Sequence, residues 1–174
     1  MSFTNSQVDP NTLPSIDDLE FTGLERSYLT AELLGLTLFW LFPSLGVVLF
    51  TIFNENDWPS WLRALPFILV LVLILTSFIW TIRAFKKKEF ALRERDIVYK
   101  SGLVWRRVTV LPFNRIQHAE VEQGPIQRIF DLSELKVYTA GGSSSDLSIS
   151  GISHDVAQRM KEFILRKTSM DEQE

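Results

Sequence analysis

The chain has 174 residues, a formal net charge of −3 at pH 7 and no cysteine. The lack of cysteine excludes disulfides, thiolate zinc sites and a cysteine nucleophile, and with only two histidines we expect no metal site. Residues 1–30 carry a net charge of −4, from one arginine and five acids, whereas residues 83–170 carry +6, from 16 Lys or Arg and 10 acids. A basic segment of this kind is attracted to an anionic membrane surface.

Residues 1–30 contain two prolines, several polar residues and no hydrophobic period. This composition predicts a flexible, acidic cytoplasmic arm, in which residues 21–28 are the one candidate for a short amphipathic helix. A signal peptide is not expected here, because a basic start followed by a short apolar core is missing.

Two long apolar segments follow, residues 31–53 and 64–82, separated by ten residues with a polar centre. Residues 33–53 and 64–82 contain no charge and would form helices about 31 Å and 28 Å long. A bilayer core is about 30 Å thick and needs roughly 20 apolar residues to cross it. The alternative, two buried helices in a soluble domain, rarely gives segments that are apolar on every side. The sequence therefore predicts a transmembrane helical hairpin over residues 31–82.

The orientation of this hairpin follows from the flanking basic residues. The loop between the helices holds Glu55 and Asp57 with Arg63 nearby. A basic run follows the second helix: Arg83, Lys86, Lys87 and Lys88. Because Lys and Arg stay on the cytoplasmic side, we expect both termini in the cytoplasm. The run serves as a topology anchor, and it is also suited to anionic lipid headgroups.

From residue 90 onward the hydrophobic period changes to two, which indicates β-strands. Strands are predicted at residues 90–93, 97–100, 105–111 and 117–123, then in a hairpin joined by the glycine- and serine-rich residues 141–145. The last element is a helix with Ser153 as N-cap and an apolar stripe of Val156, Met160, Phe163 and Ile164. We thus expect a cytoplasmic α+β domain at residues 83–168, with five to seven antiparallel strands capped by one helix, and a frayed tail at 169–174.

Three motifs in this domain carry a family resemblance. They are LPFNRIQH at residues 111–118, QGPIQRIF at 123–130 and VYTAGG at 137–142. The chain resembles the bacterial pleckstrin-homology-like membrane proteins of the YdbS family over everything except its first 30 residues. Asp131 stands where that pattern would have glycine, and an aspartate tolerates the left-handed backbone better than most residues. The resemblance implies a bacterial inner-membrane protein with a pleckstrin-homology-like (PH-like) barrel or sandwich on the cytoplasmic face, and it does not imply an enzyme.

Basic residues in this domain are the candidate contacts for lipid or partner. Arg115 and Arg128 belong to the motifs, and each is suited either to a phosphate or carboxylate or to bonding the carbonyls of its own turn. Four more candidates flank the first predicted strands: Arg93, Arg95, Arg106 and Arg107. A pair of His154 with Ser144 or Ser145 lacks the nucleophile elbow of a hydrolase, so we predict no catalytic residue and no cofactor.

These expectations describe a non-catalytic module, anchored in the bilayer, that binds another membrane protein or a second copy of itself. The alternatives are an anionic-lipid recognition module and an accessory subunit of a larger membrane enzyme or transporter. Nucleic acid is not expected as a partner, because the domain is tethered to a membrane.

Overall fold

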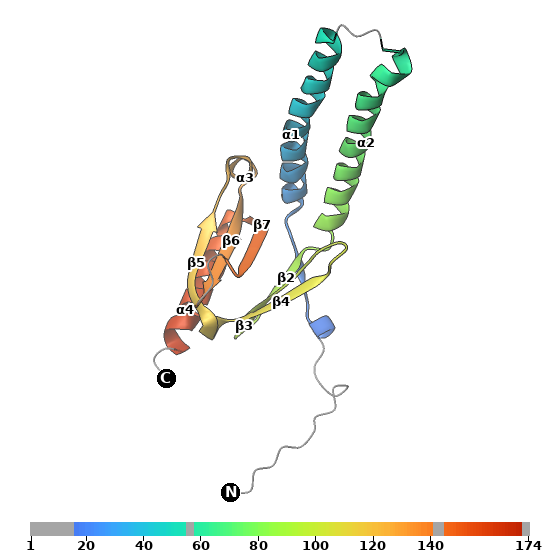
Figure 1. Cartoon of the computed structure of the whole chain (residues 1–174). Helices are drawn as coiled ribbons and strands as arrows, with labels where there is room; N and C mark the ends of the chain where they lie inside the picture. The colour runs from blue at the N-terminus through green and yellow to red at the C-terminus, as the bar shows by residue number, and fades with distance from the viewer. Residues whose placement is uncertain (1–15, 55–57, 141–144, 172–174) are drawn as a thin grey trace, which may run out of the picture.

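The computed structural model describes residues 16–54, 58–140 and 145–171. Two long helices form a hairpin that projects from a domain of two β-sheets (Figure 1). Helix α1 spans Arg26–Phe53 and helix α2 spans Ser60–Phe85, which correspond to about 42 Å and 39 Å. The predicted segments 31–53 and 64–82 lie inside these helices. Both helices extend beyond them into polar sequence, because the ends of a spanning helix continue past the apolar core.

The surface of the hairpin is apolar and uncovered by other protein segments. Phe42 and Phe53 are 81% and 77% exposed, and both helices are long and apolar enough to cross a membrane. Their few polar side chains are satisfied inside the pair. Trp40 Nε1 donates to Ser77 Oγ across the helices at 3.0 Å, and the Thr76 hydroxyl donates to the Val72 carbonyl at 2.9 Å. This arrangement suits a lipid environment, which offers no partner for a polar group.

The domain consists of two antiparallel sheets and a covering helix, as the period-two pattern predicts. The first sheet has the order β1-β2-β3-β4, with strands Thr22–Gly23, Glu89–Leu92, Asp96–Ser101 and Arg107–Pro112. The second has the order β5-β6-β7, with strands Ile116–Glu122, Leu132–Thr139 and Leu147–Ser153. The short 3-10 segment η2 (Ile16–Asp18) precedes β1. A second one, η3 (Phe113–Arg115), joins the two sheets. Helix α3 (Pro125–Ile129) lies between β5 and β6.

Helix α4 (His154–Asp171) packs on the second sheet and completes the core (Figure 1). Met160 and Ile164 of the predicted stripe are buried, Val156 and Phe163 are half-buried, and Ala157 joins them. The rings of Phe113 and Phe163 meet edge to face at 5.9 Å between centroids. The helix continues to Asp171, so the prediction of a frayed tail was wrong for residues 169–171. Residues 172–174 lie outside the described residues.

The second half of the predicted flexible arm is part of the folded domain. Thr22 of β1 pairs with Phe90 of β2, and Leu24, Tyr28 and Ala31 are buried in the core. The helix at residues 21–28 was therefore a wrong prediction, since β1 occupies its start and α1 begins at Arg26. Residues 1–15 lie outside the described residues. The transmembrane hairpin is consequently inserted between two neighbouring strands of one sheet.

Two further expectations concern turns. Asp131 has φ = 53°, in the left-handed region, so the turn survives without the glycine that the family resemblance led us to expect. Its carbonyl accepts a hydrogen bond from the His154 backbone N–H at 3.1 Å, at the start of α4. The strand predicted at 105–111 begins only at Arg107, because residues 102–106 form the tip of the β3–β4 hairpin. The loop predicted at 141–145 lies outside the described residues except for Ser145.

Candidate functional site

The strand register brings the tip of the β3–β4 hairpin to the end of α2. Three residues separate the end of α2 from strand β2, whose first residue, Glu89, pairs with Lys100 near the end of β3. Ser101 then pairs with Arg107 at the start of β4. The residues that follow the second helix and the hairpin tip therefore lie side by side, close to where the helical hairpin leaves the domain (Figure 1).

These residues line a hollow of about 270 Å³ that is strongly basic. Its charged lining consists of Lys86, Lys87, Lys100, Arg106 and Arg107, with Glu89 as the one acid among the lining residues. We call it the basic hollow. Lys100 Nζ also lies 3.9 Å from the centre of the Phe21 ring. Arginine and lysine side chains around one space are suited to the oxygens of a phosphate or carboxylate, through charge-assisted hydrogen bonds.

Gly102 fixes the shape of the tip beside this hollow. Its φ is +97°, and a Cβ at this position would come within 3.0 Å of the carbonyl carbon of Trp105. Any other residue would be strained there and would collide with the opposite side of the turn. The tight turn places Arg106 and Arg107 next to Lys100.

Arg83 and Lys88 occupy different surroundings from the rest of the predicted basic run. Arg83 belongs to α2 itself and lies in its last turn. Lys88 pairs with Glu32 of α1 at 3.4 Å and donates to the Tyr28 hydroxyl at 3.3 Å. Burial raises the pKa of the neighbouring Tyr99 to about 12, and the charge of Glu32 adds to the shift. Lys88 thus joins the ends of the two long helices, whereas Lys86 and Lys87 face the basic hollow.

Arg93 and Arg95 are separated from Arg106 and Arg107 by the length of β3. They lie at the β2–β3 turn, where Arg93 makes a two-point ion pair with Asp96 at 2.5 and 2.7 Å. The hydrogen bonds that Arg93 donates to Asp96 raise the pKa of Arg93. The Arg95 carbonyl accepts from the Phe113 N–H at 3.0 Å, which ties this turn to η3. The four arginines predicted around the first strands therefore form two groups and not one.

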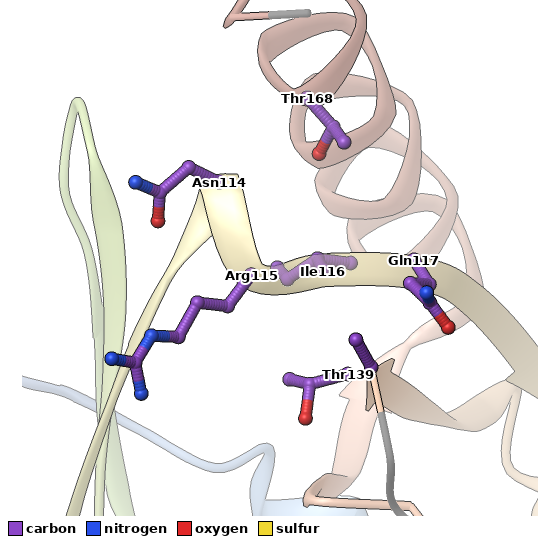
Figure 2. A pocket seen from close by; sticks show the side chains of 7 residues that line it. Asn114, Arg115, Ile116, Gln117, Thr139 and Thr168 are labelled. Atoms are coloured by element: carbon purple, nitrogen blue, oxygen red, sulfur yellow. The ribbon is translucent and has the colours of Figure 1, made fainter.

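Arg115 lines a second, larger hollow of about 510 Å³ between the start of β5, the end of β6 and α4. Figure 2 shows the side chains of Asn114 and Arg115 directed to one side and that of Gln117 to the other. The hydroxyl of Thr168 donates to the Phe113 carbonyl at 3.3 Å, and that of Thr139 donates to Asp146 at 2.6 Å. The polar groups do not converge, so this hollow lacks the geometry of a ligand site.

Arg128 lies on the exposed face of α3, away from the basic hollow. The short helix packs beside α1, where Ile126 Cδ1 would be 3.5 Å from a Cβ on Gly35. Its first turn is closed by the Gly124 N–H, which donates to the Gln127 side chain at 3.0 Å. Arg128 is thus near the first long helix, on the other side of the domain from Arg115.

The two histidines lie in structural contacts. His154 Nδ1 is 2.9 Å from the Ser133 hydroxyl, and Ser133 is fully buried, so a substrate has no access to that oxygen. His118 Nε2 is 2.8 Å from Glu120, which also accepts from the Tyr138 hydroxyl at 3.1 Å. These two hydrogen bonds lower the pKa of Glu120. Within the described residues no group of three or more His, Asp or Glu side chains is placed to hold a metal ion.

Sequence reasoning missed the apolar residues at the tip of the hairpin. Trp105 was predicted as the first residue of a strand, but it lies in the turn beside Val104. Val108 and Val110 share a face of β4, and they are 46% and 43% exposed. The available signal was the position of Trp105 after a glycine turn, in the same period-two phase as the polar Arg107 and Thr109.

Comparisons with known proteins agree with this architecture. The family model described as Bacterial PH domain matches residues 29–168. The chain is 28% identical over 110 residues to the UPF0699 transmembrane protein YdbS of Bacillus subtilis (strain 168), covering 63% of this chain and 67% of that protein. It is 33% identical over 95 residues to the UPF0699 transmembrane protein YdbT of the same organism, covering 52% of this chain and only 19% of YdbT.

Among solved structures, a DUF1696 family protein with a pleckstrin-homology domain from Shewanella loihica is similar, with 16% identity and a TM-score of 0.36. That match covers 47% of this chain and 70% of the solved one. The family model extends over 140 of the 174 residues, through most of α1, all of α2, strands β2 to β7 and most of α4. The chain is therefore a transmembrane protein that belongs to the bacterial PH domain family.

Proposed function

We propose that this protein is a non-catalytic, membrane-anchored module that binds anionic phospholipid headgroups on the cytoplasmic leaflet. The observation that carries the proposal is the basic hollow, where five basic side chains and one acid surround a space beside the end of α2. The cytoplasmic orientation is part of the proposal and rests on the excess of Lys and Arg at this end of the hairpin.

The position of the basic hollow favours a lipid over a soluble anion. Only residues 86–88 separate α2 from β2, and three extended residues span at most about 11 Å. The hollow is therefore held within reach of the headgroups of the bilayer that α2 crosses. The negative potential of an anionic leaflet attracts each nearby Lys or Arg by about 1 kcal/mol, and this attraction acts within about one Debye length of the surface.

The test is retention of lipids by the purified full-length protein, measured by native mass spectrometry with phosphatidylglycerol or phosphatidylcholine added to the detergent. Removing two charges from the hollow, in Arg106→Gln with Arg107→Gln, should reduce phosphatidylglycerol binding about 30-fold at roughly 1 kcal/mol for each charge. Phosphatidylcholine binding should be unaffected.

A matched control removes two arginines from the opposite end of the first sheet, in Arg95→Gln with Arg115→Gln. Because this pair lies away from the basic hollow, phosphatidylglycerol binding should stay within about twofold of the wild type. Equal losses in both double variants would show that binding depends only on the net charge of the protein, and would overturn the proposed site.

A second candidate function is binding to another membrane protein or to a second copy of this chain. It is favoured by β4, which ends the order of the first sheet and presents Val108 and Val110 on an exposed face. An open strand edge with apolar side chains is suited to an added strand. In mild detergent, Val110→Lys should then release a co-purifying protein or dissociate an oligomer, while leaving phosphatidylglycerol retention in place, because Val110 is not among the residues that line the basic hollow.

A further inference from the structure

The tip of the β3–β4 hairpin carries two large apolar side chains that the domain leaves uncovered. Trp105 is 88% exposed and its neighbour Val104 is 64% exposed. A tryptophan side chain offers a large apolar surface, and proteins usually bury most of it against a core or a partner. Among the described residues nothing covers this ring, so any surface that covers it would have to come from outside the domain.

The same strand register that builds the basic hollow directs this tip toward the bilayer. The chain reverses direction once after α2, at the β2–β3 turn, so β3 runs back toward the end of α2 and the turn at residues 102–106 lies nearest to it. Figure 1 shows the β3–β4 hairpin reaching up to the lower end of α2. The turn is fixed by Gly102 at φ = +97°, so the tip is a formed structure with a defined direction.

The chemistry of the tip matches the boundary between water and lipid. Residues 100–108 read KSGLVWRRV and contain three basic residues and no acid. Tryptophan is enriched at membrane interfaces, where its ring reaches the apolar side and its N–H stays among the headgroups. Flanking Lys and Arg hold such a segment against anionic lipid. A protein partner would have to reach the tip between the domain and the membrane, where α2 and the basic hollow already border it.

We propose that the β3–β4 hairpin inserts Trp105 and Val104 into the interfacial layer of the same bilayer that α1 and α2 cross. The insertion gives the domain a third point of attachment and sets its tilt against the membrane. This proposal goes beyond headgroup binding in the basic hollow, because the apolar tip can enter a neutral interface. Either proposal can hold without the other.

The natural absence of cysteine makes a site-specific probe straightforward. In Val104→Cys, a single environment-sensitive fluorophore is attached at the tip of the full-length protein in phosphatidylcholine vesicles, with and without phosphatidylglycerol. Its quenching by spin-labelled lipid and by aqueous iodide is then compared. Asn114→Cys is the matched control, because Asn114 is exposed just beyond the far end of β4.

An inserted tip requires a blue-shifted label at position 104, with lipid quenching at least several-fold above that at position 114 and iodide quenching below it. Adding Trp105→Ser to Val104→Cys should return the label toward the aqueous values, and the low contact of this ring with the domain keeps the fold intact. Insertion is overturned if positions 104 and 114 are equally open to iodide, or if protection disappears when the protein is diluted among vesicles, which would indicate contact between copies.

The two proposals separate cleanly in these variants. Trp105→Ser should leave phosphatidylglycerol retention in detergent within about twofold of the wild type, because Trp105 is not among the residues that line the basic hollow. Arg106→Gln with Arg107→Gln should lower that retention, while the label at 104 stays protected in neutral vesicles. A tip that leaves neutral vesicles when these two charges are removed would refute an apolar insertion.

Discussion

The contact between Gly151 and Tyr28 provides a direct test of how the domain grips the first helix. Gly151 of β7 has φ = +80°, and a Cβ at this position would come within 2.5 Å of Cδ1 and 2.8 Å of Cβ of the buried Tyr28. The Gly151 carbonyl also accepts from the Glu25 N–H at 2.9 Å, one residue before α1 begins. Gly151→Ala should therefore lift Tyr28 and the start of α1 off the second sheet.

The magnitude has two parts. An alanine in the left-handed region costs roughly 1–2 kcal/mol, and forcing a methyl group against a packed ring costs roughly 1–3 kcal/mol. The total, about 2–5 kcal/mol, corresponds to a fall in Tm of roughly 4–20 °C for a chain of this size. Tyr28→Ala alone should cost about 3–5 kcal/mol through the lost packing of the ring.

A double-mutant cycle isolates the contact between them. In Tyr28→Ala with Gly151→Ala the collision with the ring is gone and only the contact with the Cβ of residue 28 remains, so the combined loss should be smaller than the sum of the single losses by about 1–3 kcal/mol. The assay is thermal unfolding of the purified full-length protein in one detergent, followed by near-ultraviolet circular dichroism. Gly46→Ala is the control, because nothing lies within 4 Å of a Cβ there. Additive losses would refute the packing of Tyr28 on Gly151.

Three smaller predictions concern polar contacts. Ser133→Ala removes the buried hydroxyl beside His154 and should lower stability by about 1–3 kcal/mol, measured as a drop in Tm; an unchanged Tm would contradict it. Lys88→Met breaks a half-exposed ion pair with Glu32 and should cost only about 1 kcal/mol or less, so a Tm loss above about 5 °C would show a larger role. The Thr139 hydroxyl and N–H lower the pKa of Asp146, so this carboxylate stabilises the fold above its unfolded pKa, and the contribution is lost as pH falls through the lower folded value. Carbon-13 NMR titration should show the Asp146 midpoint rising in Thr139→Val, and an unchanged midpoint would contradict the assignment.

The elements that the sequence predicts are those with a strong local pattern. The charge-free run of residues 33–53 predicts a membrane-spanning helix, and the spacing of Met160 and Ile164 predicts a helix that covers the sheet. Strand β1 has two residues and no period of its own, so its pairing with β2 is set entirely by sequence 66 or more residues away. A long-range pairing of this kind leaves no local pattern to read, and the preceding prolines favoured a flexible arm.

The candidate site shows the same limit in another form. All five basic residues of the hollow are visible in the sequence, and four of them were named as candidate contacts. The sequence alone could not show that these residues lie together while Arg93, Arg95 and Arg115 lie elsewhere. That distinction required the register of β3, because residues at the two ends of one strand are close in sequence but far apart in the fold. The position of Trp105 likewise could not be predicted from the sequence, because it depends on the turn lying beside the end of α2.

The insertion of the helical hairpin between β1 and β2 has a mechanical consequence. The two strands pair with each other, so both ends of the hairpin are tied into one sheet. The contact of Lys88 with Glu32 and Tyr28 joins the same ends a second time. A domain held in this way cannot turn freely about a single linker, and its basic hollow and apolar tip keep a fixed height and tilt against the membrane. The lipid binding that we propose would then involve little loss of conformational freedom, so even a few basic side chains would be enough to hold a headgroup.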